Sequence, residues 1–429
     1  MSRRPTDRRG VALPLTLMVL MLLSALALLL LSMSPLEPLI SKNLAAAEQA
    51  RSLAEAGIEW AFNTLGTSLD WNAFLKGADP GRGVVLIADS PLPGGPASEG
   101  TYTVRVRNDS LAGDQQITGV PPDAGGPSDD TNSLLIITGV GNAGHGSRTL
   151  EAVLRRIELP PVAAALAFPG RRAAVNVSGS FEIDGNDSSP DGTPGSCAPV
   201  FGISVSSGLP ASAPGSNEAI IESALASSPP ASVKGKRQDP GGPDSGANTI
   251  AADGALTPSR VQAFVGAARK ADVVFESSEP AGLFFGDIGA GCASSWSSSA
   301  CWGTRERPKV IYVKGNPDPT SAVLRVQLSG NTEGYGILIV EDGELTISGN
   351  FLWRGLIVVT GSRAALGFLG GGSQSVYGSV VVNDAGLDPG AGKGFLTGNG
   401  RLRYSCQALD RSRTARRLLT LRSWREVAD

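Results

Sequence analysis

The chain has 429 residues, of which 55 are glycine and 29 are proline, while hydrophobic residues make up 41%. Glycine and proline together fill 84 of 429 positions (55 plus 29), about a fifth, below the roughly 25–30% of disordered low-complexity chains. The near balance of 37 basic and 40 acidic residues argues against a nucleic-acid partner. The single histidine, His145, argues against His-based metal sites and catalytic triads. No nucleophile motif and no carboxylate pair stands out either, so we expect no enzyme. The length predicts two or three structural units.

The amino-terminal segment is basic and then wholly uncharged. Arginines dominate the charge of Met1–Gly10, and no ionisable side chain occurs from Val11 to Leu36. A helix of about 20 apolar residues crosses a hydrocarbon core of about 30 Å. Because basic residues flank one side only, Met1–Gly10 is predicted to be a cytoplasmic leader and the remainder to be exported. We therefore expect a single-pass membrane protein.

The segment that follows is amphipathic. Ser41–Leu65 carries apolar residues at three- and four-residue steps, the pattern of one helix face. Pro35 and Pro38 each remove a helix donor, so a kink or local unwinding is expected there. Residues 11–65 are thus predicted to form one long helix in two halves, the first in lipid and the second packed on a soluble domain.

This amino-terminal pattern resembles a known family. The basic leader, Gly10, the apolar helix from Val11 and the stretch NLAAAEQARSLAEAGIEWA resemble type IV pilin-like proteins, and the PilX-type minor pilins in particular. The resemblance covers about residues 8–65. It implies that a prepilin peptidase cuts after Gly10 and that the new amino group of Val11 is methylated. It also implies a bacterial inner-membrane location and other pilins and minor pilins as partners of the helix.

One position departs from the family pattern. Major pilins carry a glutamate at the fifth mature position, which is Leu15 here. A carboxylate at membrane depth costs about 2.5–3.5 kcal/mol unless it is paired, and Leu15 offers no such pair to a neighbouring subunit. We interpret the chain as a minor, low-copy structural subunit at a pilus tip or in a priming complex. The alternatives are a type II secretion tip pseudopilin, a membrane-anchored adhesin or carbohydrate-binding protein, and a plain membrane anchor.

Residues 66–160 are predicted to form a pilin-like β head. Asp70–Gly100 is predicted to be a connector with one apolar burst at Val84–Ile87. Strands are predicted at Thr101–Arg107, Ser133–Thr138 and Thr149–Ile157, from their alternating or continuous apolar residues. A helix followed by antiparallel strands resembles the order in a pilin head.

Residues 161–429 are predicted to form a Gly/Ser-rich β domain. Two apolar strands about twenty residues apart, near 337–340 and 356–360, suggest the stacked turns of a β-solenoid; a β-sandwich with long hairpins is the alternative. The remaining strand candidates and the two helical inserts are Val175–Asp184, Ala322–Ser329, Glu344–Ser348, Ser375–Val382, Asn217–Ala226 and Ser259–Ala271. The overall fold class is therefore α+β.

The carboxyl terminus is basic. Residues 410–429 contain six arginines and three acidic residues. This positive charge could indicate contact with anionic lipid or polysaccharide. Apolar residues interleave these charges in LLTLRSW, so we favour a final strand with a solvated arginine edge, which discourages aggregation.

Four cysteines predict two disulfides in an exported chain. Cys292 and Cys301 flank a short loop, and a bridge between them would leave Cys197 and Cys406 to join the two ends of the carboxyl-terminal unit. Zinc is the competing interpretation, but no CxxC spacing occurs and His145 is distant.

Two further motifs have a functional and a plain interpretation. Gly139, Gly141 and Gly144 match the dinucleotide pattern G-x-G-x-x-G, yet no βαβ pattern follows, so we favour a glycine-bearing hairpin. The other motif is an oxygen-rich loop whose possible Ca²⁺ ligands are Asp184, Asn186, Asp187 and Asp191. It lacks the spacing of an EF-hand, and Asp and Asn are ordinary turn residues, so a turn is the favoured interpretation and no cofactor is expected beyond possible calcium.

Overall fold

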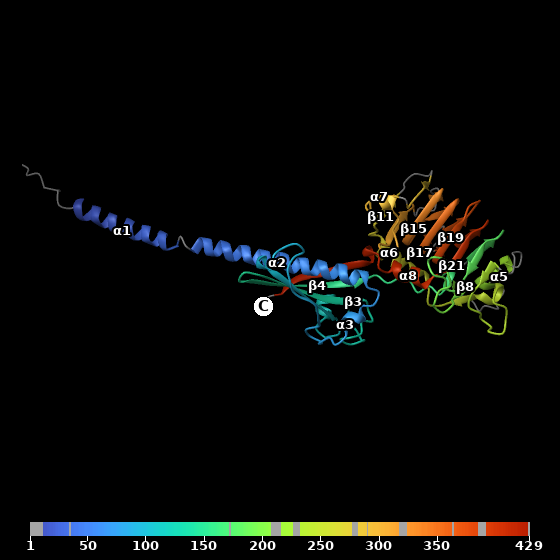
Figure 1. The fold of residues 1–429 in the computed structure, drawn as a ribbon, viewed down its shortest axis with the longest axis horizontal. Coiled ribbons are helices and arrows are strands. Elements are labelled where there is room, and N and C mark those ends of the chain that lie inside the picture. The colour runs from blue at the N-terminus through green and yellow to red at the C-terminus, as the bar shows by residue number, and fades with distance from the viewer. Residues whose placement is uncertain are drawn as a thin grey trace, which may run out of the picture.

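The computed structural model describes residues 12–33, 36–170, 173–206, 216–225, 232–276, 282–289, 291–316, 324–362, 364–384 and 392–427. It combines helices with one antiparallel and two parallel sheets. Helices α1 (Ala12–Met33) and α2 (Leu36–Thr67) extend as a stalk, and the parallel sheets lie at the end of the molecule opposite α1 (Figure 1). Helix α1 ends at Met33 and α2 begins at Leu36. Of the two prolines at which a kink is predicted, Pro35 lies outside the described residues and Pro38 lies within α2.

The head, as we use the term from here, consists of the second half of α2 and a five-stranded antiparallel sheet. The strand order is β1-β2-β3-β4-β22. These strands and the two short helices beside them are β1 (Val84–Ser90), β2 (Thr101–Asn108), β3 (Leu134–Ala143), β4 (Gly146–Arg156), β22 (Leu419–Val427), α3 (Asn72–Leu75) and α4 (Gln115–Thr118). The predicted apolar burst at Val84–Ile87 is thus a strand rather than part of a connector, because it pairs with β2 and covers that edge.

The last strand corrects the sequence-based division of the chain. Residues 161–429 were expected to form one unit, but β22 pairs with β4 of the head. Leu419 is buried in the head core, and Arg425 forms an ion pair with Glu151 of β4 at 2.6 Å. The basic terminus is therefore largely an edge strand that covers β4, and the carboxyl end lies back at the head (Figure 1).

Between β4 and β22 the chain forms what we call the parallel-strand unit, residues 164–418. Its larger sheet has the order β10-β8-β5-β19-β17-β15-β13-β11, with β21, β7 and β9 attached to one side, and its second sheet has the order β12-β14-β16-β18-β20-β6. All strand pairs that are described in these two sheets are parallel, which differs from the long antiparallel hairpins of a sandwich.

The elements of the parallel-strand unit have the following bounds. The strands are β5 (Ala164–Phe168), β6 (Ala173–Val177), β7 (Glu182–Asp184), β8 (Phe201–Ser206), β9 (Val233–Lys234), β10 (Ile250–Asp253), β11 (Val273–Glu276), β12 (Leu283–Gly286), β13 (Lys309–Lys314), β14 (Leu324–Ser329), β15 (Asn331–Glu341), β16 (Gly343–Ile347), β17 (Asn350–Gly361), β18 (Ala365–Phe368), β19 (Gln374–Asp384), β20 (Gly392–Leu396) and β21 (Arg401–Tyr404). The helices are α5 (Asn217–Leu225), α6 (Pro258–Ala268), α7 (Gly291–Ser294) and α8 (Cys406–Ser412).

Successive strands from β13 to β20 alternate between the two sheets, so each turn of chain adds one strand to each sheet. In the larger sheet, Asn331 of β15 pairs with Asn350 of β17, and Phe351 of β17 pairs with Gln374 of β19. Paired residues on successive strands are thus 19 (350 minus 331) and 23 (374 minus 351) residues apart, near the predicted spacing of about twenty residues. The apolar core, which includes Trp353, lies between the sheets, and α6 covers part of the outer face of the larger one. The predicted strand Val175–Asp184 is two strands, β6 and β7, in different sheets.

Three stacked glycines shape the larger sheet. Gly336, Gly355 and Gly378 occupy the same register on β15, β17 and β19, and each has a φ between +129° and +144°. A Cβ at Gly355 would lie 2.0 Å from the carbonyl oxygen of Gly336. Only glycine fits this conformation and this close approach. Helix α8 packs on the same strands, and the hydroxyl of Ser412 donates to the Gly336 carbonyl at 3.1 Å.

Candidate functional site

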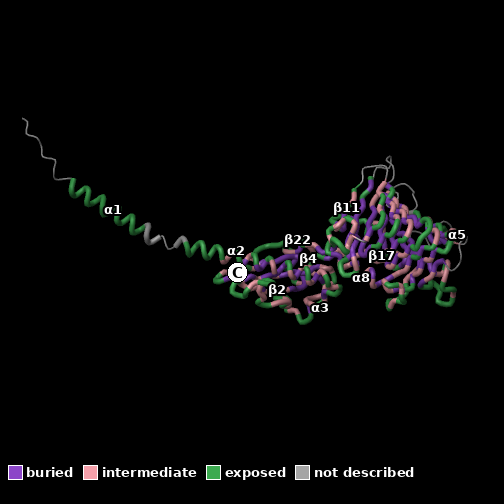
Figure 2. The backbone as a smooth tube through the Cα atoms, turned by 45° about the horizontal axis from the view of Figure 1, so that its top comes forward, coloured by how far each residue is buried: buried purple, intermediate pink, exposed green. Residues whose placement is uncertain are grey.

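Helix α1 is long and apolar enough to cross a membrane, and it is the one such helix among the described residues. None of its window Ala12–Leu29 is buried by the rest of the chain, and Figure 2 shows this helix exposed. Leu15 is 62% exposed. The Thr16 hydroxyl donates to the backbone carbonyls of Ala12 and Leu13, so this polar group is satisfied within the helix. The bare apolar surface therefore needs lipid or another protein to cover it.

Helix α2 changes from exposed to buried along its length. Leu39, Ile40 and Leu44 are exposed, whereas the apolar positions from Ala50 to Leu65 lie against β2, β3 and β4. This is the two-half helix that the sequence predicted, with the soluble domain packed on its second half (Figure 2). The processing residues Gly10 and Val11, and the leader before them, lie outside the described residues.

The glycines of the G-x-G-x-x-G motif allow α2 to lie directly on the sheet. Gly139 and Gly141 are on β3, and a Cβ at these positions would meet the carbonyl oxygens of Ala54 at 2.6 Å and Ala50 at 1.9 Å. Gly144, with φ +55°, is in the tight turn between β3 and β4. The motif is therefore a hairpin under a helix, and no helix follows it that could bind a pyrophosphate.

Arg156, the last residue of β4, caps the carboxyl-terminal end of helix α2, a role that the sequence did not indicate. Its guanidinium donates to the carbonyls of Leu65 at 2.9 Å, Ser68 at 2.5 Å and Leu69 at 3.2 Å, and its carbon Cζ lies 4.3 Å from the ring centroid of Trp71. The carbonyls at the end of a helix have no partner within the helix, and cations are favourable there. Burial lowers the pKa of Arg156 to about 10, so the side chain remains charged at neutral pH.

Replacement of Arg156 by methionine is expected to lower the free energy of unfolding by about 2–4 kcal/mol, since three carbonyls lose a charged donor in a buried site. Chemical denaturation of the full-length chain in detergent measures the loss. The control is Arg155→Met, the neighbouring arginine of β4, which faces the other side and is expected to change stability by less than about 0.5 kcal/mol. Equal losses in the two variants would contradict the capping role.

The four cysteines form the disulfides Cys197–Cys406 and Cys292–Cys301, which is the connectivity that the sequence favoured. The first bridge joins residues 209 positions apart, and the second joins residues 9 positions apart. The buried carboxylate of Asp187 accepts from the backbone N–H of Cys197 and of Cys406, at 2.9 Å each. It thereby holds both ends of the long bridge.

The residues of the predicted calcium loop make local hydrogen bonds. Asp184 accepts from the backbone and side chain of Asn186, and Asp191 accepts from the backbone and hydroxyl of Thr193. Among the described residues, the one group of three His, Cys, Asp or Glu donors close enough to share a metal is Asp187 with Cys197 and Cys406, whose sulfurs are bonded to each other. The carboxylate geometry thus gives calcium no support, and calcium stays a prediction.

Comparison with known proteins gives a distant structural likeness. No protein-family model matches the chain, and no curated protein matches it. Among solved structures, it is similar to the competence-associated pilin ComZ from Thermus thermophilus, with 11% sequence identity and a TM-score of 0.22. The alignment covers 89% of this chain and 97% of that chain.

Proposed function

We propose that the protein is a minor-pilin-like structural subunit of the PilX type, without enzymatic activity, in a type IV pilus or a related machine. It would be anchored in the bacterial inner membrane by α1, be cut by prepilin peptidase after Gly10, and contact other pilins through the amino-terminal helix. The observation that carries the proposal is the division of this helix. The described residues leave its first half uncovered, whereas its second half is buried on a β head.

A place at the tip or in a priming complex follows from two features. Leu15 offers no carboxylate to a neighbouring subunit's amino terminus, so the gain from bulk stacking is small. The parallel-strand unit, which we interpret as a β-solenoid, lies beyond the head at the end farthest from α1 (Figure 1). A subunit with this bulk at its distal end is accommodated where no further subunit has to be stacked above it.

Mass spectrometry of the membrane-extracted protein tests the processing step. The expected mature chain starts at Val11 with a methylated amino group, and a Gly10→Leu variant is expected to remain uncut. A mature wild-type chain that still starts at Met1 would contradict the proposal.

Fractionation and truncation separate the alternatives. A pilus subunit is expected in sheared pili, whereas a type II secretion pseudopilin is expected to show only a secretion defect when it is deleted. A chain that ends at residue 65 should abolish pili if the protein primes assembly. The same truncation would leave pili intact and remove attachment if the protein is an adhesin on a simple tether.

A further inference from the structure

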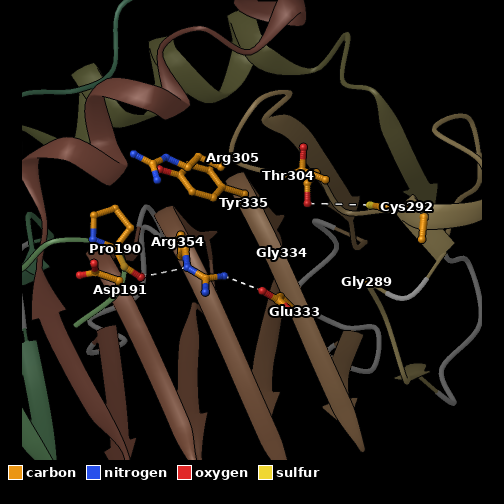
Figure 3. Close-up of a pocket in the computed structure, with 12 residues that line it drawn as sticks. Pro190, Asp191, Gly289, Cys292, Thr304, Arg305, Glu333, Gly334, Tyr335 and Arg354 are labelled. Carbon is orange, nitrogen blue, oxygen red and sulfur yellow. Dashed lines mark hydrogen bonds and ion pairs between the residues drawn. The ribbon is translucent and has the colours of Figure 1, made fainter. Parts of the chain in front are cut away.

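A cavity of about 530 Å³ opens at one edge of the parallel-strand unit. Its floor is formed by Glu333 and Tyr335 of β15 and by Arg354 of β17. Pro190 and Asp191 come from the loop after β7, and Arg305 comes from the segment between α7 and β13 (Figure 3). Four segments that are distant in sequence therefore meet around one space.

The walls of this cavity are held in place by bonds of their own. The guanidinium of Arg354 donates to the carbonyl of Pro190 at 3.0 Å and to the carboxylate of Glu333 at 2.6 Å (Figure 3). On the opposite side, the disulfide Cys292–Cys301 closes the loop that leads to Arg305. The site is thus preorganised, which lowers the entropy lost when a ligand binds.

Tyr335 brings an unused hydrogen-bonding group to the cavity. The residue is 3% exposed, and its hydroxyl has no hydrogen-bond partner within the part of the chain that the structure describes. Burial raises the pKa of Tyr335, against the opposing effect of the nearby guanidinium groups of Arg305, Arg411 and Arg354. The hydroxyl is therefore protonated at neutral pH and able to donate. A buried hydroxyl without a partner is unfavourable, so the folded chain gains nothing from it until a ligand accepts the bond.

Arg305 supplies an uncommitted cation beside this hydroxyl. Its guanidinium lies next to the Tyr335 ring (Figure 3), and it makes no hydrogen bond or ion pair with any described residue. The planar fork of an arginine matches the two oxygens of a carboxylate. Because Arg305 is exposed, its side chain can turn toward a ligand.

The other charges limit which anion fits. Asp191 and Glu333 balance Arg305 and Arg354, so the cavity is not generally cationic. Hydrogen bonds from Thr193 lower the pKa of Asp191, which is therefore an ionised acceptor at neutral pH. Two carboxylates disfavour a ligand with several phosphates. They favour a ligand that has one negative charge and several hydroxyl groups to donate.

We propose that this cavity binds an acidic sugar, with the sugar carboxylate on Arg305 and the Tyr335 hydroxyl and with sugar hydroxyls donating to Asp191 and Glu333. Binding is noncovalent. The proposal does not depend on the pilin-like function, because it concerns the parallel-strand unit alone.

Titration calorimetry of the full-length protein in detergent tests the proposal, with glucuronate, glucose and inorganic phosphate as probes. Glucuronate is expected to bind at least about tenfold more tightly than either other probe. Tyr335→Phe should weaken glucuronate binding about fivefold and Arg305→Gln more than about tenfold, the effects of a neutral and a charged hydrogen bond. Tyr335→Phe should not lower the unfolding midpoint, since the hydroxyl has no bond within the described chain and its burial without a partner is unfavourable.

The matched control is Arg325→Gln on β14, a highly exposed arginine of the second sheet, which should bind glucuronate as the wild type does. Equal binding of glucuronate and phosphate would reduce the cavity to a general anion site and overturn the proposal. Absence of glucuronate binding, or unchanged binding in Tyr335→Phe, would overturn it as well. Each of these outcomes is distinct from a failure of amino-terminal processing.

Discussion

Replacement of Gly141 by valine is expected to separate helix α2 from the head sheet and to lower the free energy of unfolding by about 3 kcal/mol or more. A Cβ at this position would lie 1.9 Å from the carbonyl oxygen of Ala50 and 2.6 Å from the backbone nitrogen of Ala54. Both atoms belong to the helix backbone, so no side-chain rotation relieves the clash. The helix has to move, and the apolar contacts of Leu53 and Ile58 with the sheet weaken as it does.

Hydrogen–deuterium exchange of the full-length chain localises this effect. Peptides from the second half of α2 and from β3 are expected to lose protection, while peptides of the parallel-strand unit keep theirs. Gly113→Ala is the control, because a Cβ there meets nothing within 4 Å. Unchanged protection in Gly141→Val would show that the close approach of helix and sheet does not hold the head together.

Loss of the Cys197–Cys406 bridge is expected to cost about 5 kcal/mol, against about 3 kcal/mol for Cys292–Cys301, on the chain-entropy estimate. The difference arises because the first bridge closes a loop with a sequence separation of 209 and the second one of 9. The long bridge also positions two backbone N–H groups on the buried carboxylate of Asp187. Its removal therefore loosens a buried charge as well as the loop.

Denaturant unfolding of the paired variants Cys197→Ala/Cys406→Ala and Cys292→Ala/Cys301→Ala makes this comparison. Each double variant removes two cysteines. The two variants therefore differ in the length of the loop that the lost bridge closes and in the surroundings of that bridge. A larger loss from the short bridge would contradict the entropic account. Asp187→Asn in the wild-type background separates the carboxylate from the bridge, because it retains one acceptor oxygen and both sulfurs.

Local sequence patterns predicted most of the helices and strands, but fewer of the contacts between elements that are distant in sequence. The charge-free run from Val11 and the apolar stripe up to Leu65 gave the two-half helix, since periodicity is a property of the chain itself. The apolar runs near 337–340 and 356–360 located the carboxyl-terminal halves of β15 and β17 and the spacing between them. The polar starts of these strands were missed, because Asn331 and Asn350 are held there by pairing with each other rather than by their own preference for strands.

The sequence by itself determined an apolar, uncharged helix with an amphipathic continuation, two disulfides and a carboxyl-terminal half built from short strands. Composition and periodicity determine these features because each depends on residues that are close along the chain or on a count of cysteines. Only the tertiary structure decided that β22 returns to the head, that Arg156 caps α2, and that Tyr335 and Arg305 meet in one cavity. These depend on contacts between residues far apart in sequence, for which no local pattern carries a signal.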